Sequence, residues 1–213
     1  METIEAIQSR RSINFFDEKK AVPIETIMRL VELAATAPSS YNLQPWETVI
    51  VADPGRKDVL RKCAYGQEKI TEASAVLIII ANPTALEENI DRVIADRIEK
   101  GYMKPEDAQA QKKAPFKLYG DKESETRRIF AVKNAAFFAM NFMIAAKGMG
   151  FDTHPMDGFI AEDVKREFHI PDDRIIPLLI AVGYPKPDLK LLPRPFRRSP
   201  AEVVRMNDYA SRG

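Results

Sequence analysis

Apolar residues recur at helical spacing in the first part of the chain. Ile24, Ile27 and Leu30 follow one another at three-residue intervals. Residues three and four positions apart lie on one face of a helix. The pattern predicts amphipathic helices over residues 3–9 and 23–37, the second of them halted by the proline that follows it.

Other stretches are apolar without a break or rich in β-branched residues. These are residues 47–52, 75–81 and 175–183. Short runs of this kind, bounded by turn residues, predict strands. A turn at 53–55 after the first strand and a helix over 56–63 complete an alternation of helices and strands.

Residues 126–148 give the strongest helical pattern, apolar almost all round. Such a helix is typical of a buried core or a subunit interface. Residues 87–111 are charged and sparsely apolar, which predicts an exposed helical excursion broken at Gly101 and Pro105. The tail, residues 184–200, holds five prolines. We expect it to be extended and able to cross to a partner.

Composition sets outer limits on fold and partners. A chain of 213 residues that is 45% hydrophobic can bury a full core, so we expect one domain over residues 1–213. Lys and Arg (32) nearly balance Asp and Glu (31), which argues against nucleic acid or a membrane as partner. We interpret the only cysteine, Cys63, as a small buried hydrophobe. Acids replace the basic residues of a signal peptide near the start, so we expect a cytoplasmic protein.

Several catalytic motifs are missing from the sequence. No Gly-x-Gly-x-x-Gly follows a predicted strand, and no phosphate-binding Gly-x-x-x-x-Gly-Lys occurs. His154 and His169 lack cysteine companions, so we expect no metal site. No Gly-x-Ser-x-Gly is present. We therefore assign no catalytic residue.

Two clusters of arginine lie far apart in the sequence. Ser9-Arg10-Arg11-Ser12 ends the first predicted helix, and Arg194, Arg197 and Arg198 lie in the extended tail. Guanidinium forks match phosphate oxygens well, so both clusters could converge on one phosphate. Solvated surface charge is the alternative interpretation of either cluster taken alone.

Two further motifs carry polar groups. Residues 37–46, Ala-Pro-Ser-Ser-Tyr-Asn-Leu-Gln-Pro-Trp, crowd hydroxyls and carboxamides between two prolines. This cradle suits a phosphorylated, hydrogen-bonding heterocycle. Residues 154–159, His-Pro-Met-Asp-Gly-Phe, predict a turn that exposes backbone amides, although a plain structural turn is equally open. We interpret Trp46 as a core residue at the start of a strand.

Together these motifs resemble the FMN-dependent nitroreductase family over residues 2–205. In that family Arg-x-Ser follows the first helix, and Pro-Ser-Ser-x-Asn-x-Gln-Pro-Trp, unbroken here, follows the second. A Pro-x-Glu/Asp-Gly-Phe turn follows the central helix, and a basic pair lies in the C-terminal arm. The resemblance implies an α+β fold, with a mixed central sheet flanked by helices and an intertwined homodimer joined by the long helix and a domain-crossing C-terminal arm.

The resemblance also implies roles for individual residues around FMN. The phosphate would be held by Arg10 and Arg198, helped by Arg11 and Arg197, with Ser12 beside them. The ring and ribityl chain would be contacted by Asn14, Pro38, Ser39, Ser40, Asn42, Gln67, Lys69, Met156, Asp157 and Gly158, with Gln44 a weaker candidate. Ser39 and Ser40 would come from the other subunit, and a backbone amide near Asp157 would donate to flavin N5. Tyr41 would face the substrate.

The implied activity is hydride transfer from NADH or NADPH to a nitroaromatic, a quinone or a related acceptor by a ping-pong mechanism. FMN would be the cofactor, NAD(P)H a visiting co-substrate, and the insertion over residues 87–125 would face the acceptor. A different class of function stays open, namely an FMN-binding carrier or regulatory module without robust turnover.

Overall fold

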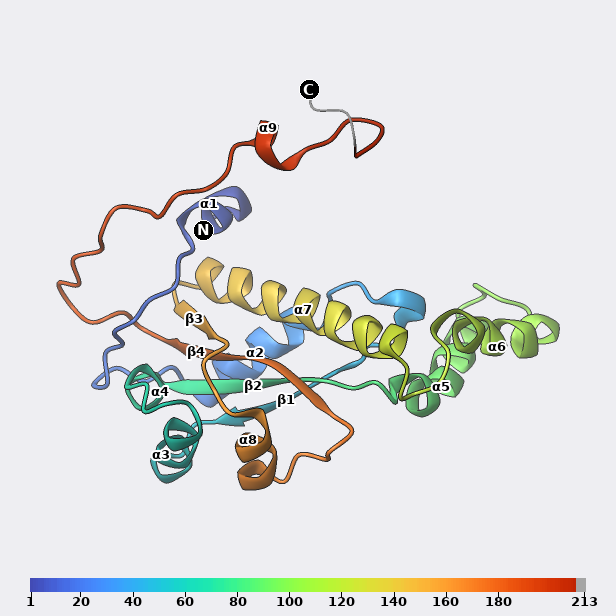
Figure 1. Cartoon of the computed structure of the whole chain (residues 1–213), viewed down its shortest axis with the longest axis horizontal. Coiled ribbons are helices and arrows are strands. Elements are labelled where there is room, and N and C mark those ends of the chain that lie inside the picture. The colour runs from blue at the N-terminus through green and yellow to red at the C-terminus, as the bar shows by residue number, and fades with distance from the viewer. Residues whose placement is uncertain (210–213) are drawn as a thin grey trace.

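Four strands form one sheet through the middle of the molecule, in the order β1-β2-β4-β3 (Figure 1). The computed structural model describes residues 1–209. The strands are β1 (Trp46–Val51), β2 (Ala75–Ala81), β3 (Asp152–Met156) and β4 (Ile175–Gly183). The two most apolar predicted strands thus became the two central ones, with the predicted bounds.

Helices cover both faces of this sheet (Figure 1). They are α1 (Thr3–Ser9), α2 (Ile24–Ala34), α3 (Pro54–Cys63), α4 (Lys69–Glu72), α5 (Ala85–Glu99), α6 (Ala108–Tyr119), α7 (Glu125–Gly148), α8 (Ala161–Phe168) and α9 (Pro200–Val203), with short 3-10 turns η1 (Ser40–Asn42) and η2 (Pro105–Asp107). This is an α+β architecture with a central sheet between helices, as the resemblance implied.

The strands run antiparallel to their neighbours, so the mixed sheet we expected is wrong for the described part of the chain. Thr48 lies opposite Ile79, for example, and β4 pairs antiparallel with both β2 and β3. The parallel pairing that the structure records is an isolated bridge between Ser12 and Thr153. An apolar run covered on both faces is typical of a parallel strand, but it serves a central antiparallel strand equally well when helices cover both sides.

Alternate residues of β2 enter two different cores. Leu77 and Ile79 pack with residues of α2, α5 and α7, whereas Val76 and Ile78 pack with residues of α3, α4 and α8. Each fully buried Leu or Ile side chain contributes about 1.5–3 kcal/mol through the hydrophobic effect. The continuous apolar run of β2 follows from this double burial.

Two predicted helix boundaries needed correction. α2 ends at Ala34 instead of residue 37, because the amides of Thr36 and Ala37 bond three residues back to Leu33 and Ala34 in tight turns. The residue before a proline disfavours helical backbone, so the helix ends ahead of Pro38. α3 begins at residue 54, inside the stretch predicted as a turn, because the Asp53 side chain caps its first turn.

α7 is the core helix of the fold. Its buried side chains include Phe130, Phe138 and Phe142. By length and composition α7 is apolar enough to cross a membrane, but half of its most apolar stretch is buried inside the molecule. That burial is the behaviour of a core helix, as its sequence pattern predicted.

The helical excursion predicted over residues 87–111 forms α5 and the start of α6, which lie together at one end of the sheet (Figure 1). The break at Gly101 is confirmed, since α5 ends at Glu99 and Gly101 has a positive φ of 74°. The segment is sparsely apolar and its charged face is exposed, as expected. The expectation is wrong for the other face of α5, which buries Ile90 and Ile94 in the core shared with α7 and β2.

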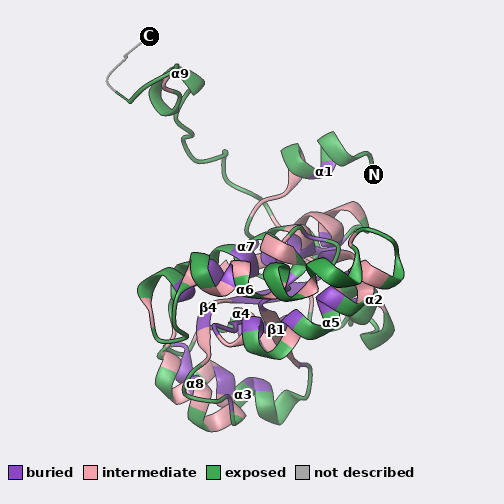
Figure 2. Ribbon diagram, turned by 90° about the vertical axis from the view of Figure 1, so that its right-hand side faces the viewer, coloured by how far each residue is buried: buried purple, intermediate pink, exposed green. Residues whose placement is uncertain are grey.

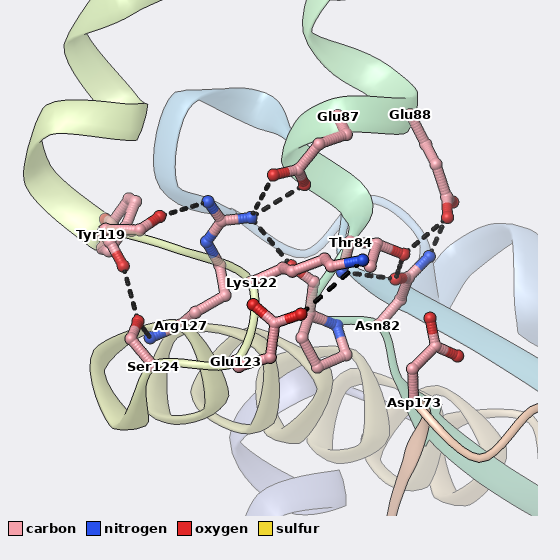
Figure 3. Close-up of polar contacts among 12 residues, drawn as sticks. Asn82, Thr84, Glu87, Glu88, Tyr119, Lys122, Glu123, Ser124, Arg127 and Asp173 are labelled. Atoms are coloured by element: carbon pink, nitrogen blue, oxygen red, sulfur yellow. Dashed lines mark hydrogen bonds and ion pairs between the residues drawn. The ribbon is translucent and has the colours of Figure 1, made fainter.

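A buried arginine of α7, Arg127, links the two ends of the segment that contains α5 and α6 (Figure 3). The Arg127 guanidinium donates to the carbonyl of Pro83 at 3.0 Å, to the carboxylate of Glu87 at 2.8 Å and to the carbonyl of Gly120. Pro83 precedes α5 and Gly120 follows α6. Both ends of the excursion are therefore attached to the first turn of α7.

The C-terminal segment leaves β4 as an extended chain and runs past α1 to α9 (Figure 1). Most of this arm is exposed, as the colouring in Figure 2 shows. The prediction of an extended tail is confirmed for the described residues. Several of its apolar side chains face solvent, among them Leu192 and Phe196 at 80% and 77% exposure.

Candidate functional site

The N-terminal arginine motif lies beside the edge strand β3. Ile13 donates from its amide to the carbonyl of Thr153 at 3.2 Å, and Ser12 forms a bridge with the same residue. The ring of His154 returns a bond from Nδ1 to the carbonyl of Ile13 at 3.0 Å. A carbonyl only accepts, so Nδ1 carries the proton. Two motifs separated by about two thirds of the chain are thereby held side by side.

Arg10 carries a buried hydrogen-bond donor that has no acceptor among the described residues. Its Nη1 is buried and has no hydrogen-bond partner in the part of the chain that the structure describes. Burial, followed by repulsion from Arg194 and Arg197, lowers the pKa of Arg10. The acid that acts in the opposite direction is Asp152, which already pairs with Lys147 at 2.8 Å. A guanidinium stays charged in proteins, and a buried charged donor without an acceptor is energetically unfavourable. An anionic acceptor bound at Arg10 would remove this cost.

Two backbone contacts bring the C-terminal arm to this cluster. Arg194 donates from Nη2 to the carbonyl of Ser9 at 2.8 Å, and Arg11 donates from Nη1 to the carbonyl of Leu192 at 2.9 Å. The arm thus meets the first motif within one chain. Arg11 uses one of its nitrogens to hold the arm.

Three arginines of the arm were singled out in the sequence. Arg194 and Arg197 are near enough to Arg10 to lower its pKa. Arg194, Arg197 and Arg198 are all exposed. Arg194, which the expected phosphate set did not include, therefore joins the residues close to the first motif, and Arg198 stays a prediction.

Gln67, just before α4, and Lys69, its first residue, form a second group of polar side chains, the Gln67–Lys69 wall. Gln67 donates from Nε2 to the carbonyl of Gly158 at 2.7 Å, and its Oε1 accepts from the Lys69 ammonium at 3.4 Å. Burial lowers the pKa of Lys69, and burial together with the Lys69 charge lowers that of His154. Gln67 and Lys69, both candidates for the same contact, therefore lie together beside β3 and its turn.

The predicted turn over residues 154–159 is in fact the end of a strand followed by a turn. His154 to Met156 belong to β3, which pairs with β4, and the chain turns only at Asp157 and Gly158. Met156 is buried, whereas Asp157 and Gly158 are exposed. Pro155 argued against a strand in the sequence, but β3 is an edge strand, where a proline is tolerated.

Gly158 lies in a tight position. A β-carbon there would meet the Gln67 amide nitrogen at 3.3 Å, closer than ordinary contact. The amide of Ile160 bonds to the carbonyl of Cys63 at 2.8 Å and fixes the far side of the turn. The turn is thus held from both ends, with its exposed residues next to Gln67.

The cradle lies along the middle of α7 and has a strained backbone. Tyr41, Asn42 and Gln44 have positive φ values of 56°, 57° and 47°. Its backbone is held by Ser40, whose amide donates to the buried Asn134 side chain at 3.2 Å, and by the Ser39 hydroxyl, which accepts from the Gln44 amide at 3.0 Å. Non-glycine residues with positive φ cost energy and cluster at binding sites.

The structure does not bring the cradle to the arginine cluster. Over residues 1–209, no hydrogen bond or ion pair joins residues 38–44 to Arg10, Arg194 or Arg197. The cradle instead faces the excursion, where the rings of Tyr41 and Tyr119 meet edge to face at 6.5 Å. A polar cleft of about 400 Å³ lies between the cradle and α5. The cradle and the arginine cluster are therefore two separate groups of polar residues on one chain.

Other predicted residues have simpler surroundings. Trp46 stacks on Phe138 of α7 at 5.6 Å between ring centroids, which supports its interpretation as a packing residue. Cys63 is buried, as predicted. Ser12 and Asn14 are exposed beside the cluster. No group of three or more His, Cys, Asp or Glu side chains within residues 1–209 could hold a metal ion.

The arginine cluster, the Gln67–Lys69 wall and the turn fit a phosphorylated ring system. The cluster offers guanidinium donors to a phosphate, and the orphaned Nη1 of Arg10 is a donor without an acceptor. The wall adds an ammonium and a carboxamide, groups that bond to carbonyl oxygens of a heterocycle. This donor set would suit the phosphate and the carbonyl oxygens of a phosphorylated heterocycle.

Comparison with known proteins agrees with this chemistry. The family model described as the Nitroreductase family matches residues 7–184. A curated relative from Bacillus subtilis, named "Putative NAD(P)H nitroreductase MhqN", is 32% identical over 198 residues, which cover 93% of this chain and 95% of the relative. The family match includes Arg10, the cradle, Gln67, Lys69 and the turn at Gly158, and it ends before Arg194.

Solved structures share the fold over almost the whole chain. The crystal structure of "putative nitroreductase ydfN" from Bacillus subtilis has a TM-score of 0.89 at 30% identity, covering 95% of this chain and 97% of that one. A "putative nitroreductase in complex with FMN" from Exiguobacterium sibiricum has a TM-score of 0.85, with 96% and 97% coverage; at 23% identity it is a likeness of fold. On the family match and the relative's identity, this chain belongs to the Nitroreductase family of NAD(P)H oxidoreductases.

Proposed function

We propose that the protein is an FMN-dependent oxidoreductase that takes hydride from NADH or NADPH and reduces nitroaromatics, quinones or related acceptors by a ping-pong mechanism. The observation that carries the proposal is the buried, unpartnered Nη1 of Arg10 among like charges. Burying a charge without a partner is costly, so such a group is retained where an anion completes it.

The flavin phosphate would be held by Arg10 and Arg197, with Ser12 and the backbone of the arm beside them. Arg198, exposed like Arg194 and Arg197, would contribute from the same arm, helped by Arg11. Arg194 joins this set on geometry, since it already bonds to Ser9. Charge-assisted contacts to phosphate are about twice as strong as neutral ones.

The ring would lie against the Gln67–Lys69 wall and the turn of Met156, Asp157 and Gly158. Lys69 would face the pyrimidine oxygens, where a fixed positive charge stabilises the negative charge that develops on reduction. When bound, FMN would supply the hydride chemistry, accepting from the nicotinamide and delivering to the acceptor. The side chains of this chain would bind and orient, and no acid or base among them would be obligatory.

A homodimer would complete the site. The cradle residues Pro38 to Asn42 form no hydrogen bond or ion pair with the arginine cluster of their own chain among the described residues. We propose that they serve the site of a second copy, with Tyr41 toward the acceptor. Asn14 lies beside the cluster of its own chain and would be near the ring edge of that site. α7 exposes Ile129, Phe137 and Met140 at 58%, 44% and 43%, an apolar stripe suited to a subunit interface. The reducing cytoplasm, where the buried Cys63 stays a thiol, suits such a protein.

Steady-state turnover tests the proposal. Purified protein with FMN should oxidise NADH or NADPH faster with a nitroaromatic or quinone than in a blank without acceptor. Flavin binding without acceptor-dependent oxidation would instead indicate a carrier or regulatory module. A protein that takes up no added FMN would refute the flavin assignment itself.

A further inference from the structure

Glu72, the last residue of α4, is a buried carboxylate that joins two distant segments. One oxygen accepts from the amide of Phe16 at 3.1 Å, and the other accepts from the Lys186 ammonium at 2.6 Å. The Glu72 side chain is 10% exposed and that of Lys186 is 40% exposed. Both carboxylate oxygens are thus engaged, each by a different segment.

The two segments, residues 15–17 and 184–186, also form hydrogen bonds with each other. The amide of Asp17 bonds to the carbonyl of Tyr184 at 2.9 Å, and that of Lys186 bonds to the carbonyl of Phe15 at 3.2 Å. Phe16 and Pro185 form an isolated bridge between them. Glu72 therefore bonds to both the N-terminal segment and the C-terminal arm at their crossing point, where Phe16 meets Pro185.

Both halves of the arginine cluster lie close to this crossing point in the sequence. Arg10 precedes Phe16 on one segment, and Arg194 and Arg197 follow Lys186 on the other. Neither segment is part of the sheet over this length. The crossing point is consequently a place where the relative positions of the two arginine groups are set.

α4 is itself held firmly. Lys57 on α3 is buried, and its ammonium donates to the carbonyls of Thr71 and Ala73 at 2.9 and 2.7 Å. These are carbonyls at the C-terminal end of α4, where a cation is favourable. Two positions before α4, Gln67 holds the turn at Gly158. A stretch of six residues thus supports the turn and the arginine cluster together.

We infer that Glu72 is a positioning residue for the phosphate of the flavin, acting through Phe16 and Lys186 and not by touching the ligand. The inference rests on the proposed function. The sign of the charge supports a geometric role, because a carboxylate near a phosphate site weakens anion binding by electrostatics alone. Any contribution of Glu72 to FMN binding would therefore come from holding the two arginine-bearing segments in register.

The test compares FMN with riboflavin, which has the same ring and ribityl chain but no phosphate. Dissociation constants of both are measured by flavin fluorescence on the full chain for the wild type, Glu72→Gln and Lys186→Met. Glu25→Gln is the matched control, since Glu25 is an exposed acid on α2, away from Glu72 and the candidate site. Lys186→Met keeps the bond between Glu72 and Phe16 and guards against misfolding of the Glu72 variant.

We expect Glu72→Gln to weaken FMN about tenfold, a loss of 1.4 kcal/mol, and to leave riboflavin unchanged, so that the preference for the phosphate collapses. Lys186→Met should act in the same direction and Glu25→Gln should have no effect. An unchanged or stronger preference for FMN in Glu72→Gln would overturn the inference, as would an equal loss for both ligands. A wild type without preference for FMN over riboflavin would instead refute the phosphate site of the proposed function.

Discussion

The carboxamide of Gln67 donates a hydrogen bond of 2.7 Å to the carbonyl of Gly158, across 91 residues of sequence. The same carboxamide accepts from Lys69 through its oxygen. This pair of contacts sets the separation between the wall before α4 and the turn after β3. The two elements on which a flavin ring would rest are therefore one unit.

Removing this contact should loosen the turn without unfolding the protein. We expect Gln67→Ala to weaken FMN about 3- to 10-fold, the equivalent of one neutral hydrogen bond worth about 0.5–1.5 kcal/mol. Fluorescence titration measures the change. Gln109→Ala, at an exposed position of α6, is the control, and equal affinities in both variants would show that the contact does not serve the site.

Arg10 should show opposite effects on binding and on stability. We expect Arg10→Met to weaken FMN by about 1.5–3 kcal/mol, the range for a lost charge-assisted hydrogen bond. The protein without FMN should become more stable, because the substitution removes a partly buried charge that Arg194 and Arg197 repel. Thermal unfolding with and without FMN measures both effects. Lower stability without FMN would mean that Arg10 serves the fold instead.

A mixed dimer can test whether each site uses two chains. We combine a chain carrying Arg10→Ala with a chain carrying Asn42→Ala, each of which should bind FMN poorly alone. If cluster and cradle come from different subunits, half the sites of each heterodimer are intact, and random mixing restores about a quarter of all sites. No recovery after co-refolding, with heterodimers verified by differential tags, would place both halves in one chain.

The sequence predicts the core elements well and the site only in part. β2 and β4 follow from continuous apolar runs, α1 from apolar residues at helical spacing, and α7 from a long stretch that is apolar almost all round. Strand direction does not follow, since it depends on the path of the connections. β3 was missed because it contains a proline and, as an edge strand, has few apolar residues.

Contacts of long sequence separation account for the rest of the site. Arg194 comes close to Arg10, and Glu72 bonds to both Phe16 and Lys186, because of the direction in which the arm leaves β4. No local sequence pattern predicts that direction. Residue type and motif spacing identified the arginine groups, the cradle and the turn as chemically meaningful. Only the fold shows that the cradle stays apart from the other two.

His154 should make stability depend on pH in a defined direction. Burial and then the Lys69 charge lower the pKa of His154 below the ordinary value of 6.5. The unfolded chain therefore binds this proton more readily, so the folded state is favoured above about pH 6.5 and loses that stability as the pH falls toward the lowered pKa. Urea unfolding at several pH values measures this, and His154→Asn should flatten the acid limb. An equally steep acid limb in the variant would assign it to other groups.

An anaerobic absorbance spectrum of the purified protein with FMN, taken before and after adding NADH and then NADPH, tests the central claim most directly. We predict a protein-bound flavin band that bleaches with at least one of the two nucleotides, which establishes hydride transfer from NAD(P)H to the bound cofactor. A flavin band that neither nucleotide bleaches would contradict the proposed reductase activity, and a protein without any bound flavin would contradict the site itself.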